Sequence, residues 1–177
     1  RNGGLRPHVS DGQEYMDIVD EADEVIGRDT RANIHARHEI HRGVHVFVVN
    51  ARGELLLQLR SAAKASYPGH WDASVGGQVA AGETYLAAAR RELVEELGCP
   101  AGALELVGTY NSYSARQREK RALFVHRYDG PLHPAADEID AIRFVAPSDI
   151  PAAMRDAPFT EGFRRSFALW SAATPRD

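Results

Sequence analysis

Three glutamates stand close together in the segment "RRELVEELG" near the middle of this 177-residue chain. Glu92, Glu95 and Glu96 are spaced at i, i+3 and i+4, which places their side chains on one face of an α-helix. Like charges at this spacing destabilise a helix by roughly 0.2–0.5 kcal/mol per pair, so something must compensate. One explanation is a solvated acidic face that pairs with Arg90 and Arg91. The other is a divalent cation, because Mg²⁺ takes one or two carboxylates and completes its shell with water and substrate phosphate oxygens.

The residues around these glutamates predict the helix that must position them. The run from Thr84 to Leu97 contains no Gly or Pro and is dominated by Ala, Leu, Arg and Glu, which are good helix formers. Thr84 is a suitable N-cap, and Gly98 is the residue expected just after the last turn. A second stripe on this helix is offset from the acidic one. We expect the second stripe to be buried and the carboxylate face to stay exposed; the stripe consists of Leu86, Ala89, Leu93 and Leu97.

A glycine and a further glutamate extend the acidic pattern toward the N-terminus. Gly77 is followed after five residues by Glu83, and Arg91 comes after seven more. The complete pattern resembles the Nudix box, and the chain is identified as similar to the Nudix hydrolase superfamily. That resemblance implies an α/β fold, a Nudix α/β/α sandwich with a mixed sheet between helices. The matching residues are Gly77, Glu83, Arg91, Glu92, Leu93, Glu95, Glu96 and Gly98, with Cys99 in place of the usual larger aliphatic residue.

The resemblance also implies a reaction, the attack of water on a phosphorus atom of a diphosphate linkage, with Mg²⁺ (or Mn²⁺) as the cofactor. Glu92, Glu95 and Glu96 are the implied metal ligands, together with the carbonyl of Gly77. Glu92 is alternatively the base that orients the water. Arg91 is implied to hold the carboxylates in place through ion pairs.

Two other residues of the box have implied structural roles. Glu83 precedes the helix and is implied to pair with Arg91. Gly98 ends the helix. Neither residue is expected to take part directly in catalysis.

Residues outside the box supply further hypotheses. Glu138 precedes a predicted strand and is either an additional base or metal ligand, or a solvated turn acid. Arg60 and Lys64 are possible phosphate contacts by their location. His41 is either a substrate contact or a histidine at the end of a strand.

The segment from His41 to Glu83 resembles one branch of the family, the isopentenyl-diphosphate isomerase-like Nudix proteins. The isomerase needs a catalytic Cys and a His, and these positions hold Gly76 and Gln78 in this chain. Because glycine can neither donate nor accept a proton, we expect a hydrolase on the isomerase framework. The isomerase binds a metal through nearby histidines. In this chain the ligand at position 78 is missing, so a metal role stays open for His35, His38, His41 and His45.

Composition limits the broad class of protein. The net charge of −4 offers no basic surface for nucleic acid, and no apolar run approaches the length of a membrane span. The lone Cys99 fits a reducing compartment, so we expect a cytoplasmic location. We expect residues 1–13 to be a flexible N-terminal extension and residues 14–177 to form one Nudix domain. The expected partner is a small-molecule diphosphate substrate, and a homodimer is suggested by the family resemblance.

Patterns along the chain predict the remaining elements. Residues 14–31 and 43–61 each read as a β-hairpin, and residues 30–40 as a short helix or an irregular connection. Single strands are predicted in four segments, 72–79, 104–115, 120–130 and 137–146. Residues 148–173 hold two helices that break near Ala157, with Ser148 or Thr160 as a possible N-cap.

Three functions are consistent with these features. The leading hypothesis is a divalent-metal-dependent hydrolase that cleaves a diphosphate linkage in a nucleoside diphosphate derivative or a related organic pyrophosphate. A Nudix enzyme acting on isoprenoid diphosphates is one alternative. The other is a non-catalytic, ligand-sensing Nudix domain. The complete set of box glutamates favours an enzyme over the sensing domain.

Overall fold

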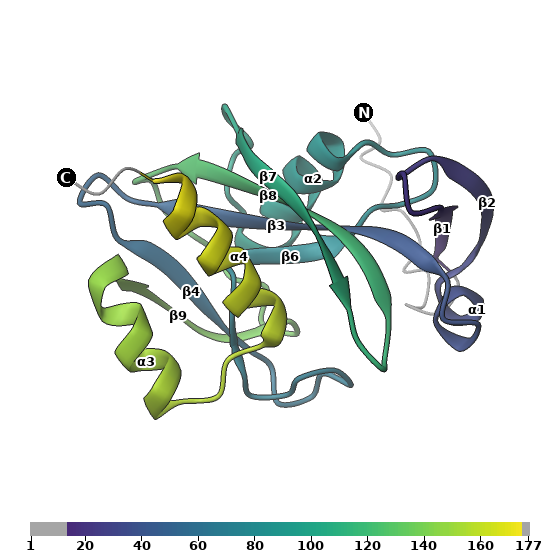
Figure 1. Cartoon of the computed structure of the whole chain (residues 1–177). Helices are drawn as coiled ribbons and strands as arrows, with labels where there is room; N and C mark the ends of the chain where they lie inside the picture. Colours follow the sequence, from purple (N-terminus) through teal and green to yellow (C-terminus); the bar gives the residue numbers. More distant parts are fainter. Residues whose placement is uncertain (1–13, 175–177) are drawn as a thin grey trace.

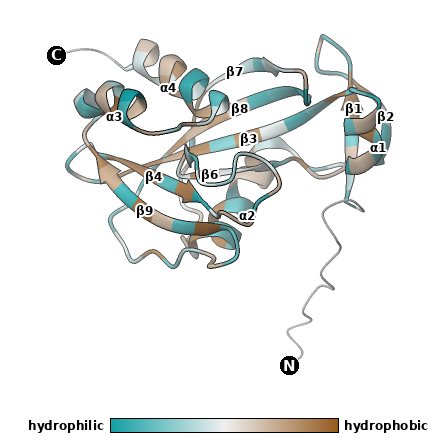
Figure 2. Ribbon diagram, turned by 90° about the horizontal axis from the view of Figure 1, so that it is seen from below, coloured by the Kyte–Doolittle hydropathy of each residue, from teal (hydrophilic) through white to brown (hydrophobic). Residues whose placement is uncertain are grey.

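A mixed β-sheet lies between helices, and residues 14–174 are described by the computed structural model (Figure 1). The strand order is β5-β4-β3-β8-β7, with β6 paired to β3 and β9 paired to β4. β3 and β8 are parallel, whereas the other pairs in this sheet are antiparallel. Helix α2 covers one face and helices α3 and α4 cover the other (Figure 2). The predicted α/β/α sandwich with a mixed sheet is therefore confirmed.

The strands and helices follow the sequence patterns closely. Strands of the main sheet are β3 (Ile40–Val49), β4 (Leu55–Arg60), β5 (Trp71–Asp72), β6 (Val75–Gln78), β7 (Glu105–Tyr113), β8 (Arg118–Arg127) and β9 (Ile139–Val145). Helices are α1 (Arg31–Ala36), α2 (Tyr85–Leu97), α3 (Ile150–Asp156) and α4 (Glu161–Ala173), with a short 3-10 helix at Pro147–Asp149. None of the helices within residues 14–174 is both long and apolar enough to cross a membrane.

The predicted N-terminal hairpin is confirmed as a separate two-stranded sheet, β1 (Tyr15–Val19) and β2 (Val25–Thr30). The acidic turn of this hairpin is bonded to strand β3 and to helix α2 through Asp23. The Asp23 carboxylate accepts hydrogen bonds from Arg42 Nε (2.7 Å) and from the Tyr85 hydroxyl (2.9 Å). The Arg42 guanidinium also lies over the Tyr85 ring. The hairpin thus holds the start of α2 against β3.

The predicted hairpin at 43–61 is only partly correct. β3 and β4 pair at the single position Val49 and Leu55, and then separate. Each strand has another partner, because β6 pairs with β3 while β5 and β9 pair with β4. Ser74 bridges the split. Its hydroxyl accepts a hydrogen bond from Val48 N (2.8 Å) and donates one to Leu56 O (2.5 Å).

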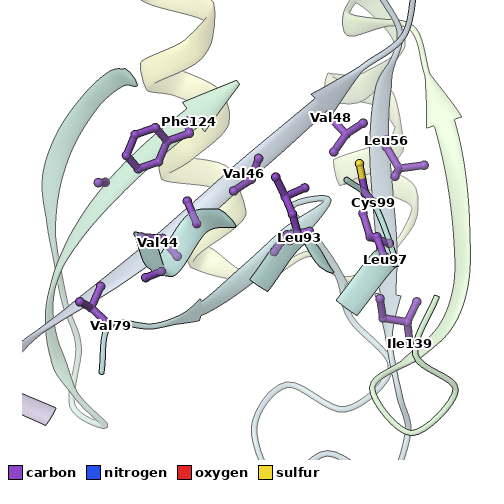
Figure 3. Packing of buried hydrophobic residues seen from close by; sticks show 14 residues of the cluster. Val44, Val46, Val48, Leu56, Val79, Leu93, Leu97, Cys99, Phe124 and Ile139 are labelled. Atoms are coloured by element: carbon purple, nitrogen blue, oxygen red, sulfur yellow. The ribbon is translucent and has the colours of Figure 1, made fainter. Parts of the chain in front are cut away.

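Two apolar clusters lie on the two faces of the sheet. Because side chains alternate along a strand, Val44, Val46 and Val48 of β3 face α2, whereas Phe47 and Val49 face α4. Figure 3 shows the first cluster, in which the valines of β3 lie beside the helix residues Leu93 and Leu97.

The predicted apolar stripe of α2 needs a correction at its first member. Ala89, Leu93 and Leu97 are fully buried, but Leu86 is 37% exposed. Leu86 belongs to the first turn, where the neighbouring Tyr85 packs against the core instead. The expectation that the carboxylate face stays exposed is also wrong for Glu96, which is buried.

The two C-terminal helices break at Ala157, as expected. Thr160 is the N-cap of α4, and its hydroxyl accepts a hydrogen bond from Phe163 N (3.1 Å). Ser148 does not cap α3, because the 3-10 turn at Pro147–Asp149 takes its place before that helix.

The Ser74 bridge generates a stability prediction. Ser74→Ala leaves the Val48 amide and the Leu56 carbonyl without this partner inside the protein. We expect it to lower the free energy of unfolding by about 1–3 kcal/mol, measured by urea denaturation. The exposed Ser148→Ala is the control and should change it by less than about 0.5 kcal/mol. An equally small change for Ser74→Ala would mean that the bridge does not hold the split sheet together.

Candidate functional site

Helix α2 is capped at both ends, which fixes its acidic face relative to the sheet. The Thr84 hydroxyl accepts a hydrogen bond from Ala87 N (3.1 Å). At the other end, Gly98 adopts a left-handed conformation (φ 57°), which favours glycine, and its N–H bonds carbonyls of the last turn. The predicted caps are both present. The helix therefore begins and ends where the box pattern requires.

Arg91 ties the carboxylates of the box together. It forms a two-point ion pair with Glu83, from Nε to Oε1 and from Nη2 to Oε2, each at 2.9 Å. Its Nη1 donates to Glu92 Oε1 (2.7 Å) and Glu95 Oε2 (3.2 Å). Nη2 also donates to the Gln78 carbonyl on β6 (2.9 Å). These contacts raise the pKa of Arg91, and they join the helix to the strand that carries Gly77.

Gly77 leaves the space that the Glu92 side chain occupies. A Cβ at this position would lie 2.2 Å from Glu92 Cδ, far closer than carbon atoms approach without a bond. The Gly77 main chain is thus in direct contact with the acidic face of α2. Burial raises the pKa of Glu92, Arg91 opposes the rise, and the charges of Glu95 and Glu14 add to it; the resulting pKa is about 7.

Glu96 is the most deeply buried carboxylate of the box, with 8% of the residue exposed. One oxygen accepts a hydrogen bond from Gln58 Nε2 (2.8 Å) on β4. Burial raises the pKa of Glu96 well above its usual value, and the charge of Glu92 adds to this rise. Glu138 and Asp72 also raise this pKa by their charge, so both lie within electrostatic range of Glu96.

Gln58 and Asp72 were not found by sequence reasoning. Gln58 interrupts a run of buried leucines on β4, and this isolated polar residue was the available signal. Asp72 belongs to the two-residue strand β5, which is paired with β4 at Gln58. Its approach to the box depends on a strand register that no local pattern specifies.

The donor set fits a divalent cation. Carboxylates from α2 are packed against the main chain of Gly77, and their mutual repulsion would be relieved by positive charge. In residues 14–174, no three His, Cys, Asp or Glu side chains already converge closely enough to hold an ion. Mg²⁺ does not need such a group, because it commonly takes one or two carboxylates and keeps several waters.

The two predicted phosphate contacts lie at the loop that follows β4. Arg60 donates from Nε and Nη2 to the Ser66 carbonyl (3.1 and 2.8 Å). Lys64 forms an ion pair with Glu138. Arg60 Nη1 also lies 3.6 Å from Asp72 Oδ2, so each cation is close to an acid whose charge raises the pKa of Glu96.

His41 lies on the face of β3 that is turned away from α2, and it is fully buried. Its Nε2 is 3.4 Å from His35 Nε2 and 3.8 Å from Glu119 Oε2. Burial lowers the pKa of His41. This burial does not support a substrate contact and favours the structural alternative.

The two remaining histidines of the cluster, His38 and His45, bond groups other than histidines. His45 Nδ1 bonds the Ser166 hydroxyl (2.8 Å), while His38 bonds the Ser114 carbonyl (2.9 Å). Within the described chain, no His cluster forms a metal site. At the isomerase positions, Gly76 faces the His45 ring and the Gln78 amide lies 3.4 Å from Glu119. Neither position carries a group that titrates near neutral pH.

Known proteins are similar to this chain in both sequence and fold. The NUDIX domain family model matches residues 39–166. The Nudix hydrolase PA4841 of Pseudomonas aeruginosa is 39% identical over 157 residues, which cover 89% of this chain and 93% of that protein. YfcD, a Nudix hydrolase of Escherichia coli strain K12, is 34% identical, with 89% and 86% covered.

Solved structures give the same result for the fold. DR0079 from Deinococcus radiodurans is 27% identical, with a TM-score of 0.76, and 89% of this chain and 98% of that chain are covered. The MutT protein from Methanosarcina mazei is 21% identical, with a TM-score of 0.66 and coverage of 77% and 96%. From the family match, the relatives and the arrangement of the box around Arg91, it follows that this chain belongs to the Nudix hydrolase family.

Proposed function

We propose that this Nudix hydrolase cleaves the diphosphate linkage of a nucleoside diphosphate derivative or a related organic pyrophosphate, with Mg²⁺ or Mn²⁺ as its cofactor. The observation that carries the proposal is the contact of Glu92 with Gly77, beside the buried Glu96. Burying carboxylates side by side costs free energy unless a cation or a proton compensates. A site that binds a cation together with a diphosphate provides that compensation.

The proposed ligands are the carboxylates of Glu92, Glu95 and Glu96 and the carbonyl of Gly77. A divalent cation bound there would neutralise the charge that develops on the phosphate oxygens. Arg91 holds Glu92 and Glu95 through its Nη1, and this role suits a residue that keeps the ligands oriented. Glu95 is the most accessible of the three, with 58% of its side chain exposed.

Glu138 is the proposed additional base or ligand. Its side chain is 39% exposed, and its charge reaches Glu96. Its carboxylate forms an ion pair with Lys64, a proposed phosphate contact. Glu92 is the alternative base.

Arg60 and Lys64 are the proposed phosphate contacts. Both side chains are about one fifth exposed, 20% for Arg60 and 23% for Lys64, so they remain accessible from one side. Planar guanidinium groups suit phosphate oxygens because they donate two parallel hydrogen bonds.

Two alternatives concern the group attached to the diphosphate. The resemblance to the isomerase branch supports an isoprenoid diphosphate as substrate. A ligand-sensing domain is the non-catalytic alternative, and the NUDIX domain of Shewanella oneidensis NrtR has been solved in complex with ADP ribose. That domain is 14% identical to this chain, so it supports the fold and adds ADP ribose to the substrates worth testing.

A cytoplasmic location, a homodimer, and one Nudix domain over residues 14–177 stay predictions. The proposed flexible extension at 1–13 lies outside the described residues, as do residues 175–177. Light scattering coupled to size exclusion would measure the mass of the assembly directly.

The first prediction from the proposed function is metal-dependent turnover. We would measure phosphate and pyrophosphate release from nucleoside di- and triphosphates, nucleotide sugars including ADP ribose, dinucleoside polyphosphates and isoprenoid diphosphates. Each would be tested with Mg²⁺, Mn²⁺ or chelator. Loss of groups that merely support metal ligands costs about 10–100-fold, so Glu96→Gln should lower kcat by about 100-fold or more. The exposed Glu105→Gln is the control.

Each outcome of this experiment selects one function. Turnover that both the chelator and Glu96→Gln abolish supports the hydrolase, and the best substrate names its class. Ligand binding without turnover across the panel would instead support the sensing domain.

The second prediction concerns Gly77. Gly77→Ala places a methyl group where the Glu92 carboxyl lies, so Glu92 must move or the strand must shift. We expect kcat to fall by about tenfold or more while the protein remains folded. Gly27→Ala is the matched control, because its Cβ would meet Ile18 at an ordinary 3.5 Å. Full activity of Gly77→Ala would contradict the proposed contact between Gly77 and the metal site.

The third prediction tests whether Glu138 is the catalytic base. If Glu138 is the base, Glu138→Gln should lower kcat by about 100-fold or more with little change in KM, since the amide cannot accept the proton. Asp137→Asn, one residue earlier and exposed, should have no effect. Unchanged kcat for Glu138→Gln would leave the base role to Glu92.

A further inference from the structure

Asp72 lies in the split between β3 and β4, where it meets groups from both faces of the sheet. It is buried, with 7% exposed. On the side of α4, its Oδ1 accepts hydrogen bonds from the Thr160 hydroxyl and from Ala73 N, both at 2.8 Å. The same oxygen is 3.7 Å from His45 Nε2. Asp72 thus bonds Thr160, the N-cap residue of α4, and ties the start of that helix to the sheet.

The other oxygen of Asp72 lies near the Arg60 guanidinium. Oδ2 is 3.6 Å from Nη1 of Arg60, which is an ion-pair distance but too long for a hydrogen bond. The remaining donor atoms of Arg60, Nε and Nη2, both bond the Ser66 carbonyl. Among residues 14–174, Nη1 therefore has no hydrogen-bond acceptor of its own.

Arg60 is also where the loop after β4 closes. Its amide donates to the His70 carbonyl (2.9 Å), and its carbonyl accepts from Gly69 N (3.1 Å). These two bonds fix the Arg60 main chain, while the guanidinium is held by Ser66 at one edge and by the charge of Asp72 at its end. A side chain that is held before binding loses less conformational entropy when it binds a phosphate.

The charge of Asp72 is not required for its structural contacts. Thr160 and Ala73 both donate to Oδ1, and a neutral amide oxygen could accept the same bonds. His45 gives no positive charge, because burial lowers its pKa far below neutrality. Arg121 is the other cation whose charge interacts with Asp72, but it is already paired with Glu119 at 2.6 Å. Of these groups, Arg60 is therefore the cation that the Asp72 carboxylate is placed to hold.

We propose that Asp72 is a positioning residue for diphosphate binding, which acts by holding the Arg60 guanidinium with Nη1 free toward the substrate. This inference rests on the proposed diphosphate chemistry and on Arg60 as a phosphate contact. Asp72 itself does not touch the substrate. Its effect should therefore disappear when Arg60 is removed.

A double-mutant cycle tests this dependence. Asp72→Asn, Arg60→Met and the double variant would be compared by KM and kcat on the best substrate. Binding of methylenediphosphonate, a non-hydrolysable diphosphate, would be measured in Mg²⁺ by calorimetry. We expect Asp72→Asn to raise KM and Kd by about fivefold to tenfold, with kcat changed by less than about twofold. In the Arg60→Met background, Asp72→Asn should add less than about twofold.

Thr160→Val is the matched control for a purely structural role. It removes the hydroxyl that bonds Asp72 and caps α4, so it should lower the thermal midpoint without raising Kd. If Asp72→Asn does not fold, Asp72→Glu, which keeps the charge on a longer side chain, takes its place in the cycle. The expected result is then a smaller rise in Kd that again disappears with Arg60→Met.

Several outcomes would overturn the inference. Equal losses from Asp72→Asn in both backgrounds would mean that Asp72 acts on Glu96 or on the fold. Unchanged binding in Asp72→Asn, or no binding of the diphosphonate by the unaltered protein, would also reject it. The proposed function fails separately, when no substrate of the panel is hydrolysed, and the calorimetric cycle can still be read in that case.

Discussion

The ion pairs of Arg91 are the interaction on which the arrangement of the box depends. Without a cation beside them, carboxylates crowded on one face of α2 would repel one another and favour other side-chain conformations. Arg91 meets Glu83, Glu92 and Glu95 at once and also bonds the Gln78 carbonyl. One side chain therefore joins the loop before the helix, the helix itself and strand β6. The Gly77 main chain can lie against Glu92 because β6 is held in this way.

The sequence was sufficient for features that depend on local spacing. The box helix and its two caps follow from separations along a single helix, where geometry is fixed at 3.6 residues per turn. The Glu83–Arg91 pair was implied by the family resemblance. The α/β/α sandwich followed from the family resemblance. Features that depend on strand pairing were not accessible. Gln58 and Asp72 reach the site only because β4, β5 and β6 adopt one particular register around the split in the sheet.

Burial was the property that sequence reasoning judged least well. Glu96 is buried although acidic side chains are rarely so, while the apolar Leu86 is partly exposed. For His41 the sequence left a substrate contact and a structural histidine open, and its packing with His35 and Glu119 favours the structural role. In each case the outcome depends on which neighbours the tertiary fold supplies. At Glu96, the hydrogen bond that Gln58 donates offsets part of the cost of burying the carboxyl group.

The split between β3 and β4 has a wider consequence for how the two halves of the sandwich influence each other. In an unbroken sheet, the hydrogen-bonded backbone separates the two faces, and groups on opposite sides are largely insulated. In this protein Asp72 occupies the opening, bonded to the Thr160 cap of α4 and within electrostatic range of Glu96. A carboxylate bonded to a helix on one face of the sheet thus contributes to the electrostatic potential at a buried glutamate on the other face. The two faces of this sandwich are therefore joined by charge through the opening, although the backbone hydrogen bonds of the sheet stop there.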